Sequence, residues 1–507
     1  MKLRVRCLEL DAGGKTIAII NSEDARELGV RGLERIVISK GNKRITAVAN
    51  VSNDFVMEGD IVVYSEVKTL LGLKNGDFVY AVARPELESK KFIRKKIDGE
   101  ELNYKEANSI VKDVVARNLS DLELAALITG LYRNGLDSHE NYYFTKAFLE
   151  TSDKRLHLSG TIVDKHSCGG VAGDKTSMLL VPIIAAAGLT IPKTSSRAIT
   201  APAGTADRVE AICPVVHDAN KIKEIVKKTG GCMVWGGSLD MVLADDLLIQ
   251  IEKPLAMDPL IVPSVISKKK AVGSKYVVID IPTGPEAKFK TKEDAEKMAK
   301  EFINIGNRFG MKIECVLTRA DQPIGFAIGP KLEAKEALSA LMHPHSAPKD
   351  LVDKVTSLAG ILLTMVKKGD KNTAKKILFS GKAEKKFREI IAAQGGNYDV
   401  TPKDLEKRVG KIEIRTQKSG YVSAISNNKL ITLAKLAGTP KDSYSGIVLN
   451  NKIGSKVNKR ELLYTIFIEK SIKQKLVRNE LKTGDGFTIS GKARKMVIEE
   501  IDHIKRK

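Results

Sequence analysis

The sequence predicts a multidomain α/β protein with a small β-rich N-terminal domain, a helical domain, an α/β domain with a mixed or parallel sheet, and a C-terminal α+β domain. Three observations support this prediction. The 507 residues are too many for one hydrophobic core. The spacing of apolar residues changes from two to about 3.6 near Tyr104. Strand-like and helix-like segments then alternate through the middle of the chain, as in a parallel sheet covered by helices.

The first two predicted domains differ in this apolar spacing. Residues 1–84 contain short β-branched runs, such as KTIAIIN and DIVVYSEV, which Gly, Asn and Asp interrupt. The charged stretch ARPELESKKFIRKKIDGEELN then indicates a linker that leads into the helical domain, which we place at residues 85–157. Ser120 is the expected N-cap of a helix there, with Glu123 at capping-box spacing. Part of residues 240–275 is expected to join this domain.

The last two predicted domains follow from the order of the segments. Across residues 158–409, apolar strands such as GTIV and KYVVIDIP alternate with helical segments, including an amphipathic helix near residues 291–305. Beyond residue 410, runs such as SGYVSAI and ELLYTIFIE return to short strands separated by Gly and Asn. Residues 410–507 are therefore expected to form an α+β domain.

The composition argues against membrane and metal-binding classes. No apolar run approaches the roughly 18 residues of a membrane span, and the N-terminus lacks the apolar core of a signal peptide, so we expect a cytoplasmic protein. The five cysteines form no CxxC pair. His343 and His345 have no Cys, His or acidic partner at ligand spacing, so we expect no metal site.

The chain is strongly basic, with 84 Lys and Arg against 62 Asp and Glu and a net charge of +22. Such a charge can indicate nucleic-acid binding. The lysines are interspersed with glutamates, however, as in KTKEDAEKMAKE, and aromatic residues make up only 5% of the chain, which is few for stacking on bases. We therefore expect no nucleic-acid partner and interpret the charge as a solvated surface that attracts anionic substrates.

The glycine-rich segment VDKHSCGGVAGDKTS follows an apolar strand and precedes a helix predicted to begin near Thr176. Glycines let backbone N–H groups close around an anion, and the helix N-terminus adds partial positive charge. Lys165 supplies a full charge, while Ser167 and Ser177 supply hydroxyl donors. The segment is not a P-loop, because its lysine precedes the glycines. It nevertheless predicts a phosphate-binding loop.

A second segment, KTSSRAITAPAGTADRVEAI, concentrates hydrogen-bond donors after the strand LTIPK. Its donors are Ser195, Ser196, Arg197, Thr200 and Thr205. This density is greater than a plain connection requires. Because ligands of open α/β sheets bind at the carboxyl ends of strands, we expect the two segments to form one anion site.

The two segments together resemble the signature segments of the thymidine/pyrimidine-nucleoside phosphorylase family, and the second matches that family's Ser-x-Arg…Gly-Thr-x-Asp-x-x-Glu pattern. The similarity continues through residues 104–152, SVISKKKA at 264–271 and SGYVSAI, and so covers nearly all the chain after residue 85. The resemblance implies an enzyme in which inorganic phosphate attacks a sugar, with substrate bound between the helical and α/β domains. It implies no cofactor, because phosphate is itself a substrate, and it implies a homodimer or a larger homo-oligomer.

The resemblance also assigns roles to residues. The attacking phosphate would be held by Lys165, Ser167, Gly169, Gly170, Ser177, Ser195 and Thr205. The nucleotide would contact Ser196, Arg197, Ala198, Ile199, Thr200, Ala201, Ser264, Lys268 and Lys288. His166 would act as a catalytic residue near the sugar and base.

Three departures from the pyrimidine enzymes resemble the archaeal AMP phosphorylase branch of this family. The chain has an additional β-rich unit at its N-terminus and an additional residue, Ala172 or a neighbour, in the first loop. It also lacks the base-binding Arg ahead of the Ser-x-x-x-Lys-Lys element, where Ile249, Gln250 and Ile251 stand. The branch implies phosphorolysis of AMP, and also of CMP and UMP, to free base and α-D-ribose 1,5-bisphosphate, in nucleotide salvage or degradation.

The same branch implies an acid for the leaving base. Asp258 in KPLAMDP matches the Asp of its PL-x-x-D-P segment. Adenine leaves readily only when a ring nitrogen gains a proton, so this carboxyl would have to be protonated at working pH. A nucleotide substrate also brings a 5′-phosphate that needs cations of its own, and Arg197, Lys268 and Lys288 are the candidates.

Two other enzyme classes remain as alternatives. A thymidine or general pyrimidine nucleoside phosphorylase is the nearest, and the missing Arg argues against it. A phosphoribosyltransferase of the anthranilate type has a related fold and phosphate loop. It would need Mg²⁺ and an acidic pair to hold a diphosphate, and we find no convincing pair in the sequence.

Overall fold

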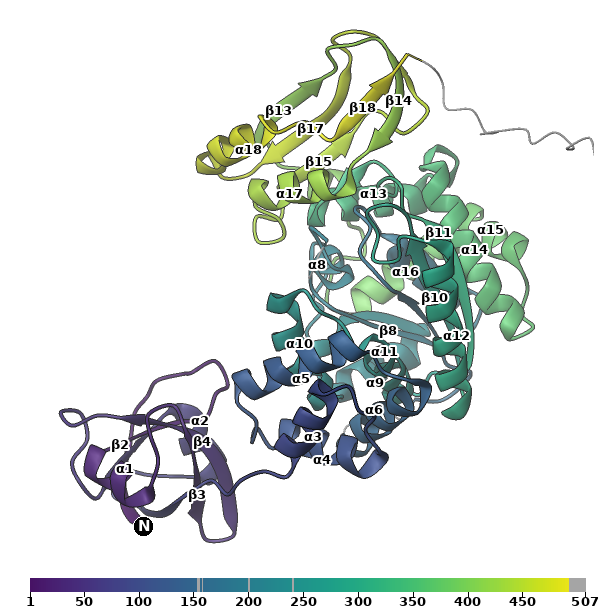
Figure 1. Cartoon of the computed structure of the whole chain (residues 1–507). Helices are drawn as coiled ribbons and strands as arrows, with labels where there is room; N and C mark the ends of the chain where they lie inside the picture. Colours follow the sequence, from purple (N-terminus) through teal and green to yellow (C-terminus); the bar gives the residue numbers. More distant parts are fainter. Residues whose placement is uncertain (153–155, 157, 199–200, 239–240, 492–507) are drawn as a thin grey trace, which may run out of the picture. The chain divides into compact units, whose positions relative to one another are not determined.

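The computed structural model describes residues 1–152, 156, 158–198, 201–238 and 241–491 (Figure 1). The chain divides into two units by its internal contacts. The first contains Met1–Thr151 and Leu243–Pro263, and the second contains Ser152–Val242 and Ser264–Lys507. Each unit is described separately below.

The first unit begins with a closed barrel of six strands in the order β1-β5-β2-β4-β3-β6. The strands are β1 (Lys2–Cys7), β2 (Ile17–Ile20), β3 (Arg35–Lys40), β4 (Lys43–Val51), β5 (Asp60–Val63) and β6 (Phe78–Ala83). Two short helices, α1 (Ser22–Leu28) and α2 (Ser65–Leu71), connect them. Alternate residues such as Leu3 and Val5 of β1, or Ile36 and Ile38 of β3, fill the barrel. This period of two is the one that the sequence shows.

The rest of the first unit is a helical bundle. Its helices are α3 (Ser89–Ile97), α4 (Tyr104–Val115), α5 (Asp121–Asn134), α6 (Ser138–Glu150) and α10 (Leu243–Leu255). The predicted capping box of α5 is confirmed, because the Ser120 side chain accepts from the Glu123 N–H and Glu123 returns a hydrogen bond to the Ser120 backbone. Helix α10 comes from a distant part of the sequence and packs on α4 and α5.

The predicted linker is wrong, because residues 89–97 form helix α3 of the bundle. Ile93 of α3 is buried, and Lys96 forms a buried ion pair with Glu140 of α6 at 2.7 Å. A Cβ on Gly130 of α5 would lie 3.0 Å from the Ile97 side chain, so the two helices approach closely. The many charged residues of this segment made it look like a solvated linker, although one of its lysines, Lys96, is buried and paired with Glu140.

The second unit begins with an α/β domain whose five central strands are all parallel. Two sheets, β11-β10-β7 and β8-β9, are joined by a parallel bridge between Ile162 and Thr190. The strands are β7 (Val163–Ser167), β8 (Ile191–Ser195), β9 (Gly231–Trp235), β10 (Tyr276–Thr283) and β11 (Lys312–Arg319). Their carboxyl ends therefore lie along one edge, where ligands of such sheets bind.

Helices cover this sheet. They are α7 (Thr176–Ala186), α8 (Thr205–Glu210), α9 (Ala219–Thr229), α11 (Ile261–Ala271), α12 (Lys292–Arg308), α13 (Pro330–Met342), α14 (Lys349–Met365), α15 (Lys371–Phe379) and α16 (Lys382–Ala393). Helix α7 is buried along almost its whole length, which explains its continuous apolar sequence. It connects the first glycine-rich segment to the centre of the hydrophobic core.

A C-terminal α+β region completes the second unit (Figure 1). One antiparallel sheet has the order β12-β15-β17-β13 and a smaller one the order β16-β14-β18. The elements are β12 (Ala327–Ile328), β13 (Gly410–Arg415), β14 (Gly420–Ile425), α17 (Asn427–Ala437), β15 (Gly446–Leu449), β16 (Lys456–Val457), β17 (Leu462–Ile468), α18 (Gln474–Leu481) and β18 (Phe487–Ser490). Strand β12 precedes α13 in the sequence, so this sheet ties the two parts of the unit together.

Candidate functional site

The first glycine-rich loop joins β7 to α7 and packs tightly against the segment that precedes α13. Gly173 has a φ of +75°, and a Cβ there would lie 2.4 Å from the carbonyl oxygen of Ile324. Only glycine fits that position without moving the backbone. The loop is therefore held in one conformation, with Gly169 and Gly170 at its start and Ser177 buried in the first turn of α7.

Lys165 and Ser167, at the end of β7, meet a buried carboxylate on the neighbouring strand β10. Ser167 Oγ donates to Asp280 Oδ2 at 2.9 Å, and Lys165 Nζ lies 3.8 Å from the same oxygen. Lys354 of α14 lies 2.8 Å from it, and Thr318 of β11 donates to the other oxygen at 2.6 Å. Asp280 thus arranges the two residues that were predicted to bind phosphate.

Asp174 contributes a second carboxylate to this group. Its Oδ2 lies 3.8 Å from Lys165 Nζ. Burial by itself would raise the pKa of Asp174, but the ammonium groups of Lys165 and Lys354 hold that pKa below its usual range. Asp174 therefore remains ionised, and its charge helps to raise the pKa of Lys354 against the effect of burial.

Further lysines surround His166. Lys269 of α11 donates to Asp164 Oδ2 at 2.7 Å, and Lys193 of β8 is also buried. Burial, followed by the charges of Lys269 and Lys165, lowers the pKa of Lys193 well below its usual value. Partial burial of the His166 ring, together with nearby ammonium groups, lowers the pKa of His166 well below 6.5. The imidazole is therefore neutral near pH 7.

We call these groups the lysine cluster. Its members are Lys165, Lys193, Lys269, Lys354, Asp164, Asp174 and Asp280. Lysines depress one another's pKa when their charges are not balanced. Burial is the main cause of the depressed pKa of Lys193, and the charges of Lys269 and Lys165 add to it. The four lysines of the cluster outnumber its three carboxylates, so an anion bound beside them would be attracted to the cluster.

The second predicted loop follows β8 and closes on the start of α8. Asp207 accepts hydrogen bonds from the backbone N–H groups of Ala198 and Gly204, both at 2.7 Å. A Cβ on Gly204 would lie 2.5 Å from the carbonyl carbon of Arg197, so the turn folds directly onto itself. Thr205 begins α8, Ser196 is exposed, and Ala201 is half-buried. Ile199 and Thr200 lie outside the described residues.

Arg197 is held by carboxylates within this loop. Its Nη2 donates to Glu210 Oε1 at 2.7 Å, and its Nη1 lies 3.3 Å from Asp207. The guanidinium also lies over the Trp235 ring, 5.2 Å from the ring centroid. These contacts raise the pKa of Arg197 above its usual value, chiefly through the hydrogen bond to Glu210. In this structure the Arg197 side chain therefore stabilises the conformation of the loop.

Several other predicted residues lie at the end of β8, after β10 or on α11. Ser195 ends β8 and donates to the Val234 carbonyl at 3.4 Å, beside the end of β7. Ser264 and Lys268 lie on α11, as does Lys269 of the cluster. Lys288 lies between β10 and α12, and its Cβ would be 3.3 Å from a Cβ on Gly169. Lys288 is therefore adjacent to the glycine-rich loop.

Asp258 belongs to the first unit, in the turn between α10 and α11, and its side chain is exposed. Its role as the acid stays a prediction, as do the roles of the residues above. Among the described residues, no group of three or more His, Cys, Asp or Glu side chains could hold a metal ion. No helix in the described part of the chain is long and apolar enough to cross a membrane.

Sequence reasoning missed part of the cluster. Asp164 and Asp280 each interrupt an apolar strand, in GTIVDKHS and KYVVIDIP, and a carboxylate in a buried strand is a signal that could have been used. Lys269 follows the predicted Lys268 directly. Lys354 lies in an ordinary amphipathic helix, DLVDKVTSL, and carries no local signal.

Comparisons with known proteins agree with this architecture. Residues 90–152 match the model of the Glycosyl transferase family, helical bundle domain, and residues 159–384 match that of the Glycosyl transferase family, a/b domain. Anthranilate phosphoribosyltransferase from Thermus thermophilus shares the fold, with a TM-score of 0.51 and 19% identity over 60% of this chain and 99% of that chain. The enzyme of the same name from Saccharomyces cerevisiae gives a TM-score of 0.50 at 14% identity, over 61% of this chain and 99% of that chain.

Sequence relatives extend over the whole chain. The AMP phosphorylase of Thermofilum pendens is 43% identical over 99% of this chain and 98% of its own length. The AMP phosphorylase of Thermococcus sibiricus is 41% identical over 99% of this chain and 100% of its own length. That of Methanococcoides burtonii is 40% identical over 100% of both chains. A nearly full-length match at this level of identity includes the N-terminal barrel. With both domains of the Glycosyl transferase family present and relatives of one name spanning its whole length, the chain belongs to the AMP phosphorylase family.

Proposed function

We propose that this protein catalyses the reversible phosphorolysis of AMP, and also of CMP and UMP, to free base and α-D-ribose 1,5-bisphosphate, in nucleotide salvage or degradation. The relatives' shared name supports the reaction. The observation that carries it here is the lysine cluster, in which four lysines, three of them buried, lie among three carboxylates beside the glycine-rich loop. A buried cationic site of this kind binds an anion and excludes water, which would otherwise hydrolyse the sugar.

The attacking phosphate is bound by the first loop and its neighbours. Lys165 provides charge, while Gly169 and Gly170 provide backbone N–H groups. The hydroxyls come from Ser167, Ser177, Ser195 and Thr205. Because Ser167 and Lys165 contact Asp280, phosphate shares these two donors with that carboxylate. The shared contacts hold the donors in place before phosphate arrives, which lowers the cost of ordering them.

The nucleotide is bound by the second loop, by α11 and by Lys288. Ser196, Ala198, Ile199, Thr200, Ala201 and Ser264 contact the sugar and base. We assign the 5′-phosphate to Lys288, which lies beside the glycine-rich loop, and to Lys268, which shares α11 with Lys269 of the cluster. Arg197 is held by Glu210 and Asp207 and supports the loop that carries the other contacts.

The reaction breaks the bond between the anomeric carbon and the base nitrogen, and it forms a bond between that carbon and a phosphate oxygen. Asp258 gives its proton to the leaving base. Neutral His166, with its depressed pKa, hydrogen-bonds to the sugar without adding a charge that would oppose the cationic transition state. No cofactor takes part, because inorganic phosphate supplies the nucleophile.

The functional unit is a homodimer or a larger homo-oligomer in the cytoplasm, and its partners are small anions. The N-terminal barrel is proposed to build the larger assembly. Light scattering of a variant that lacks residues 1–84 tests this proposal. A smaller assembly is expected, and an unchanged mass would contradict it.

The decisive experiment quantifies the base released from AMP, adenosine, CMP, UMP and thymidine, with and without inorganic phosphate. Phosphate-dependent release of adenine from AMP, but not from adenosine, is expected. Release of thymine from thymidine with AMP inert would instead indicate a pyrimidine nucleoside phosphorylase. No release from any substrate would rule out the mechanism proposed above.

A further inference from the structure

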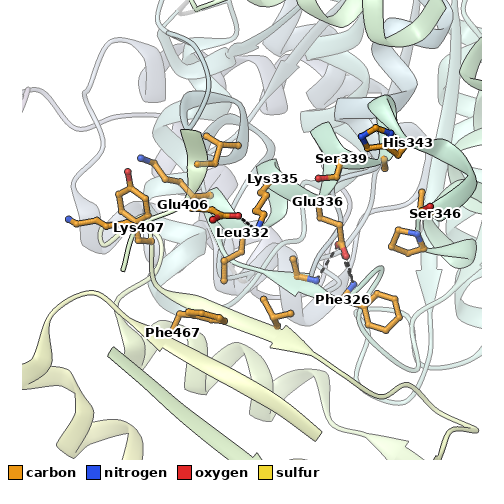
Figure 2. Close-up of a pocket in the computed structure, with 18 of the residues that line it drawn as sticks. Phe326, Leu332, Lys335, Glu336, Ser339, His343, Ser346, Glu406, Lys407 and Phe467 are labelled. Carbon is orange, nitrogen blue, oxygen red and sulfur yellow. Dashed lines mark hydrogen bonds and ion pairs between the residues drawn. The ribbon is translucent and has the colours of Figure 1, made fainter. Parts of the chain in front are cut away.

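A large cavity of the second unit lies away from the lysine cluster. Its volume is about 1260 Å³, and none of its lining residues belongs to the cluster. Helix α13, residues 405–409 and the strands β15 and β17 form its walls. Figure 2 shows Lys335 and Glu336 of α13 on one side and Phe467 of β17 on the other. All of these elements belong to the second unit.

This cavity is rich in positive charge. Its basic side chains are Lys331, Lys335, Lys349, Lys407, Arg408, Lys411 and Lys452, and its acidic ones are Glu336, Asp350 and Glu406. Carboxylates bind three of the lysines, in the pairs Lys335–Glu406, Lys452–Asp350 and Lys407–Glu469. Among the described residues, the other four basic side chains form no ion pair.

Aromatic rings hold two of these four basic side chains. Lys331 Nζ lies over the Tyr444 ring, 3.7 Å from its centroid, and Lys411 Nζ lies 5.3 Å from the centroid of Phe467. A ring face orients an ammonium group but, unlike a carboxylate, brings no negative charge to balance it. The two lysines are therefore positioned in the cavity while still able to bind an anion.

We propose that this cavity binds a nucleoside polyphosphate and that the bound nucleotide changes the affinity of the lysine cluster for phosphate. The volume exceeds what inorganic phosphate needs and suits a nucleotide-sized ligand. Apolar side chains, among them Leu332, Val409 and Val448, line the wall against which the nucleoside packs. The seven basic and three acidic side chains leave an excess that matches a polyphosphate better than a single phosphate.

Glu336 gives the cavity a direct connection to the glycine-rich loop. It accepts hydrogen bonds from the Phe326 and Ala327 N–H groups, at 3.0 and 3.2 Å (Figure 2). It also accepts one from Lys175, a buried residue that directly precedes α7 and donates further to the Ile324 and Ala327 carbonyls. A ligand that moves Glu336 therefore moves the residue at which the phosphate loop ends.

Helix α14 gives a second connection. Asp350 lines the cavity, where it pairs with Lys452 at 2.9 Å and accepts from the Gly325 N–H at 3.1 Å. One turn along the same helix, Lys354 pairs with Asp280 of the cluster. An anion that draws Lys452 away from Asp350 would therefore shift helix α14 and, with it, the contact between Lys354 and Asp280 in the phosphate site.

Isothermal titration of the full-length enzyme with ATP, in saturating inorganic phosphate, tests the binding. We expect one ATP per chain, and we expect Lys331→Ala combined with Lys411→Ala to weaken binding by at least about tenfold. Lys375→Ala, which removes an exposed lysine of α15 outside the cavity, is the matched control and should bind as the wild type does. Inorganic tripolyphosphate should bind more weakly than ATP, because it lacks the nucleoside.

The second readout is the KM for phosphate in AMP phosphorolysis, with and without ATP. This part rests on the proposed function, whereas the titration does not depend on turnover. A change in KM that disappears in the double variant is expected. ATP binding that the double variant leaves intact, or that Lys165→Met abolishes, would overturn the site. Binding at the cavity with no change in KM would overturn the coupling.

Discussion

Replacing Lys165 with methionine separates phosphate binding from folding. Lys165 is buried and lies 3.8 Å from both Asp174 and Asp280. Methionine keeps most of the side-chain volume but removes the charge. The two carboxylates are not left alone, because Lys354 interacts with both of them. The variant should therefore fold, and its defect should appear when phosphate is added.

The expected effect on stability is small because large contributions cancel. At an effective dielectric constant of 20, each 3.8 Å pair is worth about 4 kcal/mol. Burying the ammonium group costs several kcal/mol, and repulsion from Lys193 adds to that cost. We therefore expect the free energy of unfolding without phosphate to change by less than about 2 kcal/mol.

The expected effect on phosphate binding is large. A hydrogen bond from a charged donor contributes about 1.5–3 kcal/mol, so its loss raises the Kd for phosphate by roughly 10- to 150-fold. At a concentration of about 100 times Kd, phosphate stabilises the wild type by about 2.7 kcal/mol. If the Kd rises about 100-fold, the same concentration stabilises the variant by only about 0.4 kcal/mol.

Two measurements check this prediction, namely the KM for phosphate at saturating AMP and urea denaturation with and without phosphate. Lys270→Met is the control, because Lys270 is a partly buried lysine outside the cluster. Its ammonium group donates to the Phe309 carbonyl at 2.6 Å. The control should keep the wild-type KM. A KM for phosphate in Lys165→Met within twofold of the wild type, or full stabilisation of the variant by phosphate, would refute the assignment of the cluster.

Three more predictions concern Asp280 of the cluster, His166 beside it, and Lys288 next to the glycine-rich loop. Asp280→Asn should lower the free energy of unfolding by about 3–5 kcal/mol, because Lys354 and Lys165 both lose a buried carboxylate and, of the cluster, only Asp174 remains near both. Urea denaturation should then show that phosphate restores more stability to this variant than to the wild type, and equal restoration would contradict this. Because the pKa of His166 in the folded protein lies below its unfolded value of about 6.5, the unfolded chain binds more protons below that pH and wild-type stability falls as pH decreases. His166→Gln should lose less stability between about pH 7.5 and 5.5, and equal losses would count against the shift. Lys288→Ala, beside Gly169, should raise the KM for AMP about tenfold without changing the KM for phosphate, and initial rates that show the reverse would exclude its role at the 5′-phosphate.

The local features of this protein could be predicted because their causes are local. The capping box of Ser120 and Glu123 needs only the four residues from one to the other. The strand-loop-helix pattern around Lys165 and Ser167 depends on a short apolar run, a group of glycines and the helix after them. The change in apolar spacing near Tyr104 likewise marked where the barrel gives way to helices.

The failures arose where a residue's partner is far away in the sequence. The segment that contains Lys96 looked like a solvated linker, because its partner Glu140 is 44 residues away and lies on another helix. Nothing in the sequence indicated that Glu210 would hold Arg197, whose contact with the nucleotide stays a prediction.

By itself, the sequence determined the order of the domains, the two donor-rich loops and the chemistry that their residue types allow. Only the tertiary structure decided how those donors are held and charged. Asp280 is 113 residues from Ser167, and strand pairing brings them together at the edge of the sheet. The depressed pKa values of Lys193 and His166 depend first on burial and then on lysines that come from separate strands and a helix. Electrostatic interactions depend on distance in space, and the folded chain alone determines those distances.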